Sequence, residues 1–171
     1  GEVELLPVSK TFRVEAIREA VSSGFRRFGE NRTQELVQKA PALSDCGVDW
    51  VIIGHLQTNK AKEVARYASE LQSLDRLDLA QALDRRLQAE GRQIDVLVQI
   101  KTSDEETKSG LEPDALIPFL REVARIPTLR VKGLMTIAAL SDDVGVARGC
   151  FAALRQLRDR RRPCQRAGEQ R

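Results

Sequence analysis

Apolar and polar positions along the chain follow two alternating patterns. Short, nearly continuous apolar runs predict buried strands at residues 3–8, 26–30, 49–54, 71–74, 94–100 and 130–137. Between them, apolar residues recur at helical spacing and predict helices at residues 14–23, 33–40, 59–68, 77–89, 113–125 and 144–161. Gly24 and Gly91 stand where two of these helices would end, and Pro113 where another would begin. Strict alternation of strands and helices predicts a parallel sheet with right-handed crossovers.

The spacing of the strands favours a barrel over an open sheet. Each strand–helix unit takes about 25–30 residues, which is the pace of a (β/α)8 barrel. An open sheet that binds a nucleotide usually has a glycine-rich first turn, whereas the first turn here reads Ser9-Lys10-Thr11-Phe12. We therefore predict an α/β fold of the TIM-barrel-like (β/α) parallel barrel type, with two of the barrel's eight units lacking.

Composition narrows the class of protein. The 171 residues are 42% hydrophobic and 31% charged, which fits one soluble globular domain with a sizeable core. No apolar run reaches the length of a membrane span and no signal peptide opens the chain, so we expect a cytoplasmic protein without membrane contact. Cys46, Cys150 and Cys164 lack a metal-like spacing and are interpreted as reduced thiols. The single histidine, His55, cannot form a histidine-rich metal site.

The net charge of +3 is concentrated at one end of the chain. Residues 155–171 contain seven arginines and two acidic residues, so this stretch carries +5 and the remainder −2. The body therefore lacks the basic surface that nucleic acid requires, and we expect no nucleic-acid partner. We assign residues 1–162 to the barrel domain and residues 163–171 to a basic tail.

Lys10 is the first candidate for chemistry, because it ends the first apolar run. A lysine at that point is expected to be poorly hydrated, and desolvation favours the neutral amine, which is a nucleophile toward aldehydes. The alternative is a lysine whose ammonium simply reaches out to water. The surrounding strand ends bear on this choice, since active sites of such barrels lie at the carboxyl ends of the strands.

Each of the other strand ends carries polar or sulfur-containing side chains that would converge on one rim. They are Glu30 and Asn31, His55 and Gln57, Ser73 and Asp75, Gln99 and Lys101, and Met135 and Thr136. Structural explanations are available for several of them. Asn31 and Asp75 can cap the helices that follow, as Ser73 can, and His55 can donate to a backbone carbonyl. Lys101 can be simply solvated, and Met135 can be packed in the core.

Five motifs stand in the order and spacing of one known family. They are Pro7–Thr11, Phe28–Asn31 followed by Gln34 and Glu35, Ile53–Lys60, Lys108–Gly110 and Gly133–Ile137. Together they closely resemble the pyridoxal phosphate homeostasis proteins, also called the YggS or proline-synthase-co-transcribed family. The resemblance covers about residues 3–160.

The resemblance implies a fold like the amino-terminal barrel domain of alanine racemase. It implies that Lys10 holds pyridoxal 5'-phosphate as a Schiff base and that Asn31 lies near the pyridine ring. Ser73 and Met135 would line the pocket, with His55 at its edge. Members of the family are similar to carriers of the cofactor in vitamin B6 balance, which implies a binding protein without catalytic turnover.

Two other functions stay open. A fold-type-III enzyme acting on amino acids would use Lys10 as both anchor and base, but a racemase also needs a second, opposed acid or base. The only tyrosine, Tyr67, lies on a predicted helix. The third possibility is a remnant that binds no cofactor and associates with other proteins through open sheet edges.

Three departures from the family pattern lead to further expectations. The helix that usually precedes the first strand is missing, and Arg32 replaces a frequent aromatic residue. The family's phosphate-binding segment and the partner of the pyridine nitrogen are not found before the chain ends at Arg171. We therefore expect a chain that lacks the last two strand–helix units and binds the cofactor reversibly. The intact family would be monomeric, whereas this chain is expected to be unstable, to associate through its open edges or to rearrange.

Overall fold

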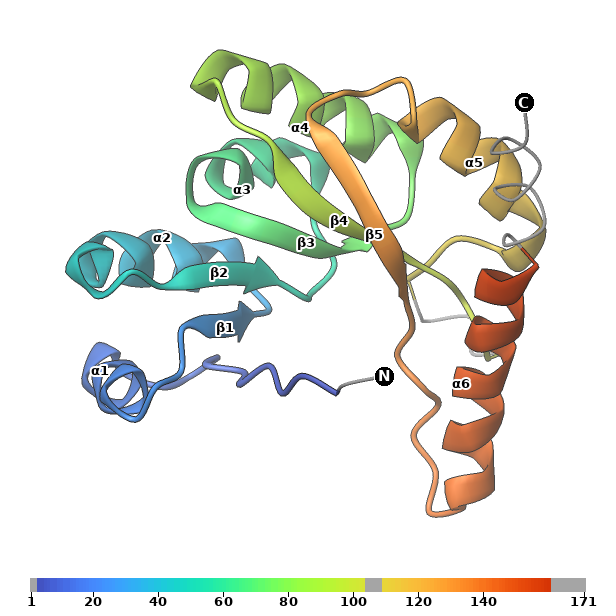
Figure 1. Ribbon diagram of the computed structural model, residues 1–171, viewed down its shortest axis with the longest axis horizontal. Helices are drawn as coiled ribbons and strands as arrows, with labels where there is room; N and C mark the ends of the chain where they lie inside the picture. Colours follow the sequence, from blue (N-terminus) through green and yellow to red (C-terminus); the bar gives the residue numbers. More distant parts are fainter. Residues whose placement is uncertain (1–2, 104–108, 161–171) are drawn as a thin grey trace, which may run out of the picture.

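The computed structural model describes residues 3–103 and 109–160 and contains one parallel sheet. Its strands pair in the order β1-β2-β3-β4-β5, so neighbours in sequence are neighbours in the sheet. The strands are β1 Arg27–Glu30, β2 Asp49–Ile52, β3 Ala68–Leu74, β4 Ile94–Gln99 and β5 Leu129–Met135. This confirms the predicted parallel sheet, and Figure 1 shows the strands fanning round a curve, as in part of a barrel.

The helices alternate with the strands as predicted. They are α1 Val14–Ser22, α2 Thr33–Ala42, α3 Ala61–Tyr67, α4 Leu77–Glu90, α5 Leu116–Val123 and α6 Val144–Asp159. In Figure 1, α2, α3 and α4 lie along one side of the curved sheet, and α6 stands beside the end of β5. We call the face of the sheet turned away from α2–α4 the open face. No helix among the described residues combines the length and apolar character needed to cross a bilayer.

The core lies between the sheet and the helices. Alternate residues of β4 supply one side of it, and leucines spaced by four residues on α4 supply the other. These residues are Ile94, Val96 and Val98 on the strand, with Ile100 just past its end, and Leu79, Leu83 and Leu87 on the helix. Each fully buried leucine contributes about 1.5–3 kcal/mol relative to an exposed one. Gly91 ends α4 in the left-handed conformation at φ 63°, as its position in the sequence predicts.

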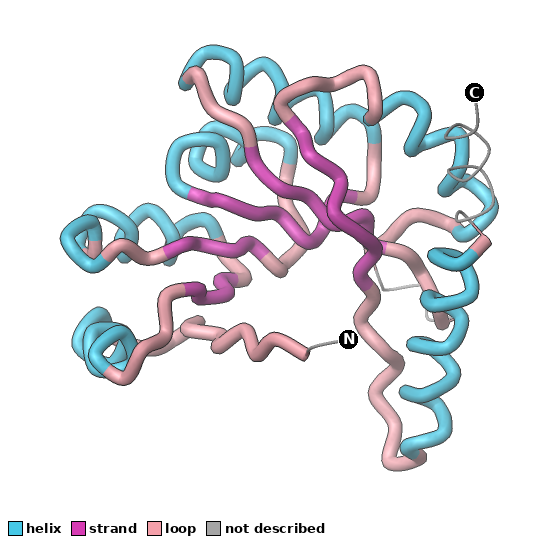
Figure 2. The backbone as a smooth tube through the Cα atoms, viewed as in Figure 1, coloured by secondary structure: helices cyan, strands magenta, loops and turns pink. Residues whose placement is uncertain are grey.

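The prediction of a first strand at residues 3–8 is wrong for most of that segment. Residues 3–9 form an arm that joins the sheet only at Val8, through a parallel bridge to Gly29 (Figure 2). The Ser9 N–H donates to the Gly29 carbonyl at 2.9 Å, and the Gly29 N–H donates to the Pro7 carbonyl at 2.8 Å. Val3 is 97% exposed. An apolar run becomes a buried strand only where both faces are covered, and among the described strands only β1 pairs with the arm.

Several predicted boundaries also shift. The predicted helix at 59–68 begins as the 3-10 turn Thr58–Lys60, and its last residue already belongs to β3. The predicted helix at 113–125 divides into the 3-10 turn Pro113–Ala115 and α5. Local propensity sets such boundaries weakly, because tertiary packing decides where a helix yields to a strand. Residues 104–108 of the predicted polar loop and the predicted tail at 163–171 lie outside the described residues.

Candidate cofactor site at the carboxyl ends of the strands

The arm, β1 and a turn position Lys10. A Cβ placed on Gly29 would meet the side chains of Leu6, Val8 and Ile53 at 3.5 Å, so these groups share one face. Side chains alternate along an extended chain, which places Ser9 on the side opposite to Val8. The Ser9 hydroxyl donates to Glu30 Oε1 at 2.7 Å, on the side of α2. Lys10 itself lies in the turn that follows the arm, and the Phe12 N–H closes this turn by donating to the Ser9 carbonyl at 3.1 Å.

The side chain of Lys10 is exposed, and its amine has no hydrogen-bond or ion-pair partner among the described residues. The expected apolar surroundings of Lys10 are thus not found, and this prediction is wrong. The physical reason is that the open face beside the arm carries no covering strand in the described structure. The amine is instead free and accessible, as the alternative interpretation predicts.

Next to the backbone around Lys10, on the helix side, lies a largely buried group of charged side chains. The Lys39 ammonium on α2 lies 2.7 Å from Glu30 Oε1 and 2.7 Å from Glu35 Oε2. Burial lowers the pKa of Lys39, but the hydrogen bonds to the two carboxylates outweigh it and leave the pKa above its ordinary value. The bond from Lys39 holds the pKa of Glu35 below its usual range. Lys39 and Glu35 are therefore both charged at neutral pH.

Asn31 follows β1 at the point where two loops touch. A Cβ on Gly54 would lie 2.3 Å from the Asn31 carbonyl oxygen, so only glycine permits this contact between the loops after β1 and β2. Asn31 does not cap α2, because the N-cap position is Arg32 and has no side-chain cap bond. The half-buried Asn31 instead borders a cavity of about 620 Å³, which His55 also lines.

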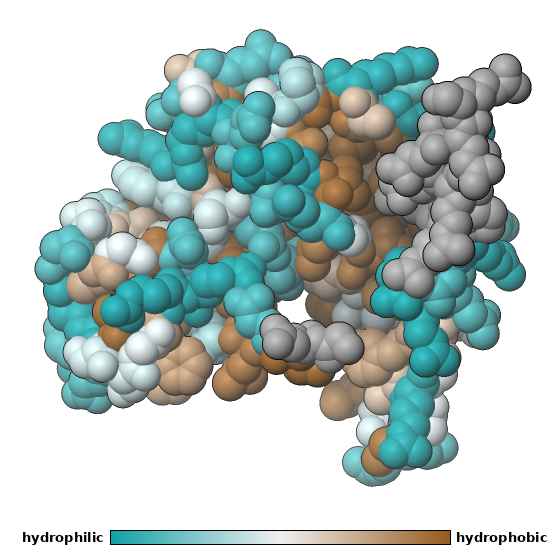
Figure 3. Space-filling model, viewed as in Figure 1, coloured by the Kyte–Doolittle hydropathy of each residue, from teal (hydrophilic) through white to brown (hydrophobic). Residues whose placement is uncertain are grey.

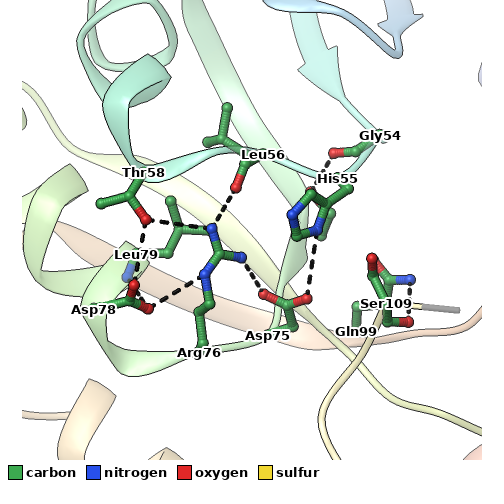
Figure 4. A network of polar contacts seen from close by, with 11 residues as sticks. Gly54, His55, Leu56, Thr58, Asp75, Arg76, Asp78, Leu79, Gln99 and Ser109 are labelled. Carbon is green, nitrogen blue, oxygen red and sulfur yellow. Dashed lines mark hydrogen bonds and ion pairs between the residues drawn. The ribbon is translucent and has the colours of Figure 1, made fainter. Parts of the chain in front are cut away.

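His55 and Asp75 meet beyond the ends of β2 and β3. His55 Nδ1 lies 3.8 Å from Asp75 Oδ2, and Arg76 holds the other carboxylate oxygen at 2.7 Å (Figure 4). Arg76 also donates to the Leu56 carbonyl at 2.6 Å. Asp75 is therefore not the predicted helix cap: α4 has Arg76 at its N-cap without a side-chain bond. Asp75 orients the strand-end residues instead.

Ser73 and Met135 lie near the carboxyl ends of β3 and β5. Ser73 is fully buried, and its hydroxyl donates to the Gly54 carbonyl at 2.7 Å, so it ties β3 to the loop that carries His55. Met135 pairs in register with Gln99 at the ends of β5 and β4. Registered neighbours point to the same side of a sheet, and the half-buried Met135 therefore lies beside Gln99.

A second cavity, of about 260 Å³, lies between the ends of β4 and β5. His55 lines it together with Gln99, Thr102, Ser109 and Ile137. The Gln99 amide donates to the Ser109 carbonyl at 2.9 Å, which closes one wall (Figure 4). His55 thus borders both cavities, and the walls offer hydroxyl, amide and imidazole groups.

The remaining strand-end predictions have mixed outcomes. Lys101 is not simply solvated, because its ammonium forms an ion pair with Glu112 at 2.8 Å. Lys108 of the fourth motif lies outside the described residues. In the described part of the chain, no group of three or more His, Cys, Asp or Glu is placed to hold a metal ion.

Sequence reasoning missed the two cations that organise the site, Lys39 and Arg76. The signal for Lys39 was its spacing of four residues from Glu35, which marks an ion pair on one helix face. The signal for Arg76 was its place between Asp75 and Asp78, and both acids contact it. Neither pattern by itself distinguishes a structural cation from an ordinary surface lysine or arginine.

Comparisons with known proteins identify the family. A family model described as "Alanine racemase, N-terminal domain" matches residues 1–169. The Pyridoxal phosphate homeostasis protein of Aquifex aeolicus is 39% identical over 156 residues, covering 91% of this chain and 68% of the relative. The Escherichia coli K12 protein of the same name is 43% identical over 141 residues, covering 81% and 60%.

A solved structure agrees with the family model and with the two curated relatives. PipY of Synechococcus elongatus PCC7942, solved with PLP bound, superposes with a TM-score of 0.85 at 33% identity and covers 92% of this chain and 74% of PipY. This chain spans 60% and 68% of the length of the two curated relatives. The chain therefore belongs to the pyridoxal phosphate homeostasis protein family and has the TIM-barrel-like fold of the alanine racemase N-terminal domain.

Proposed function

We propose that this chain binds pyridoxal 5'-phosphate in the cytoplasm, acts in vitamin B6 balance, and holds the cofactor as a Schiff base on Lys10. The observation that carries the proposal is the exposed amine of Lys10, which has no partner among the described residues, in the turn beside the carboxyl end of β1. Two curated relatives are named pyridoxal phosphate homeostasis protein, and PipY was solved with PLP bound.

The described residues fit such a cofactor. Pyridoxal phosphate supplies an aldehyde that condenses with an amine with loss of water, and a free lysine can react without first breaking an ion pair. Asn31 and His55 present amide and imidazole groups beside the larger cavity. Met135 adds an apolar side chain at the end of β5. Ser73 acts through its bond to Gly54, which positions the loop of His55.

Two features support binding without turnover. Tyr67 ends α3 immediately before Ala68, the first residue of β3, and so lies at the amino end of the sheet. A second acid or base opposed to Lys10 would have to lie at the carboxyl end of the sheet, beside the candidate cofactor-binding residues. The exposure of Lys10 leaves its linkage open to water, which favours a reversible exchange of the cofactor. The position of Tyr67 and the exposure of Lys10 both fit a protein that carries the cofactor without turnover.

An absorption titration with pyridoxal phosphate tests the proposal. The wild type should give a visible band that saturates, and Lys10→Ala should abolish it. Lys62→Ala is the matched control, because Lys62 is an exposed lysine on α3. Borohydride reduction followed by peptide mapping should place the label on Lys10. Equal, weak labelling of many lysines in all three proteins would instead identify a chain that binds no cofactor specifically.

The absence of turnover is tested separately. The loaded protein is incubated with L-alanine, and formation of D-alanine is followed against free pyridoxal phosphate at the same concentration. We expect the two rates to be equal. Racemisation that exceeds the free cofactor and disappears in Lys10→Ala would establish the enzyme alternative.

A further inference from the structure

The two peptide groups that flank Lys10 are held by one buried cluster. The Lys39 ammonium donates to the Ser9 carbonyl at 2.7 Å, and Glu35 Oε2 accepts from the Thr11 N–H at 2.8 Å. Ser9 precedes Lys10 and Thr11 follows it. Because Lys39 and Glu35 also bind each other at 2.7 Å, the backbone on both sides of Lys10 is tied to a single ion pair on α2.

Each of the three N–H donors of the Lys39 ammonium has an acceptor. An ammonium has three N–H donors, and its acceptors here are the Ser9 carbonyl, Glu30 Oε1 and Glu35 Oε2, each at 2.7 Å. The Lys39 side chain is 8% exposed and Glu30 is fully buried. Charge-assisted bonds away from water are short and directional, so they fix the backbone more firmly than surface ion pairs do.

Thr11 shows that the segment is held against its own preference. Its φ is 66°, and it is the only non-glycine residue with positive φ in the described chain. A β-branched residue pays a steric cost in this region, which persists only where the surroundings impose it. Two bonds hold this conformation: the Thr11 N–H donates to Glu35, and the Phe12 N–H donates to the Ser9 carbonyl at 3.1 Å. The turn at Lys10 and Thr11 is thus tied to the cluster through Ser9 and Thr11.

We propose that Lys39 is a positioning residue for Lys10: with Glu30 and Glu35 it forms a buried clamp on the helix side of the sheet that sets the direction in which the Lys10 amine leaves the arm. The inference rests on the proposed function in one respect: a cofactor bound to Lys10 would be held in one orientation. The clamp touches the backbone of Ser9 and Thr11 and not the amine itself, so it acts on geometry.

The test compares Lys39→Met with Lys62→Met, an exposed lysine on α3, in the full chain. Lys39→Met removes the three bonds and keeps an unbranched side chain of similar length. We expect half-saturation with pyridoxal phosphate to need about tenfold more cofactor. We also expect the visible circular dichroism per bound cofactor to fall by more than half, since a chromophore without fixed orientation loses this signal. Lys62→Met should match the wild type in both.

A readout without cofactor separates this inference from the proposed function. Reductive methylation with formaldehyde, followed by mass spectrometry, gives the rate at Lys10 relative to Lys62 in the same molecule. The ratio should change at least twofold in Lys39→Met, and it should do so even if pyridoxal phosphate proves not to bind. Should Lys39→Met not fold, Glu35→Met removes the acceptor of the Thr11 N–H at a partly exposed position and should give the same changes to a smaller degree. An unchanged ratio and an unchanged dichroism in a folded variant would overturn the proposal.

Discussion

His55 Nδ1 lies 3.8 Å from Asp75 Oδ2, although the two residues follow different strands. The His55 side chain is 49% exposed, whereas that of Asp75 is 8% exposed and is held by Arg76. The buried carboxylate therefore gives the exposed imidazole a preferred direction, between the two cavities that His55 borders. Arg76 is the residue on which this arrangement depends.

Arg76→Ala should lower the free energy of unfolding by about 2 kcal/mol, because it leaves the Asp75 carboxylate and the Leu56 carbonyl without their cation. The unfolding can be followed by the fluorescence of Trp50, the chain's single tryptophan, which is buried in β2. Arg125→Ala is the control, since Arg125 is 75% exposed beside Glu122 and should change stability by less than about 0.5 kcal/mol. Equal effects of the two variants would contradict this account of Arg76.

Gly54→Ala should destabilise the protein by about 1–3 kcal/mol, because its Cβ would lie 2.3 Å from the Asn31 carbonyl oxygen and must push the two loops apart. Urea unfolding gives the difference in free energy. Gly149→Ala is a matched control in which the same methyl group meets nothing within 4 Å. It lies inside α6 and should stabilise the chain by about 0.5–1 kcal/mol. If Gly54→Ala left the free energy of unfolding unchanged, the loops after β1 and β2 would be able to move apart without cost.

The clamp predicts how stability depends on pH. The pKa of Glu35 is lowered by its bonds to Lys39 and Thr11, so its contribution is complete above pH 4.5 and is lost as the pH falls further. Although burial lowers the pKa of Lys39, its bonds to Glu30 and Glu35 raise it above 10.5. That contribution is therefore complete below pH 10.5 and lost at higher pH. Unfolding free energies measured from pH 7 to pH 3 should fall less steeply in Glu35→Gln than in the wild type.

A surface carboxylate serves as the control for this pH experiment. The hydrogen bond from Arg18 lowers the pKa of Asp45 from 3.8 to about 2, but the Asp45 side chain is 65% exposed. Water screens such a pair, so Asp45→Asn should leave the acid dependence almost unchanged above pH 4. A larger effect of Asp45→Asn than of Glu35→Gln would show that the buried clamp is not the main acid-sensitive element.

Self-association with a second copy of this chain should depend on the edge at β5, the last strand of the described sheet. Figure 3 shows apolar surface beside β5, and Ile137, just past the strand, is 55% exposed. We expect sedimentation velocity to show association that rises with concentration, and Ile137→Lys to weaken it, because a charge at a sheet edge opposes pairing. Ile117→Lys, on α5 at 45% exposure, should leave association unchanged. A monomer at all concentrations would contradict the prediction.

Local patterns were sufficient for the order of the elements. Continuous apolar runs such as 94–100 and helical spacing such as 77–89 depend on near neighbours in the chain, and both elements lie close to where they were predicted. The same patterns placed Lys10, His55 and Met135 at strand ends, because parallel strands all end at one edge. The family resemblance, which the comparisons confirm, also rested on motifs within short segments.

By itself, then, the sequence determined the parallel α/β fold, the family and the position of Lys10 at the end of the first segment. Only the tertiary structure decided that residues 3–8 pair at one point, that Lys10 is exposed, and that Ser73 donates to Gly54. It alone revealed the bond from Lys39 to the backbone before Lys10, 30 residues away in the chain. Burial and hydrogen-bond partners depend on which helix and strand pack together, and a local pattern carries no information about such distant contacts.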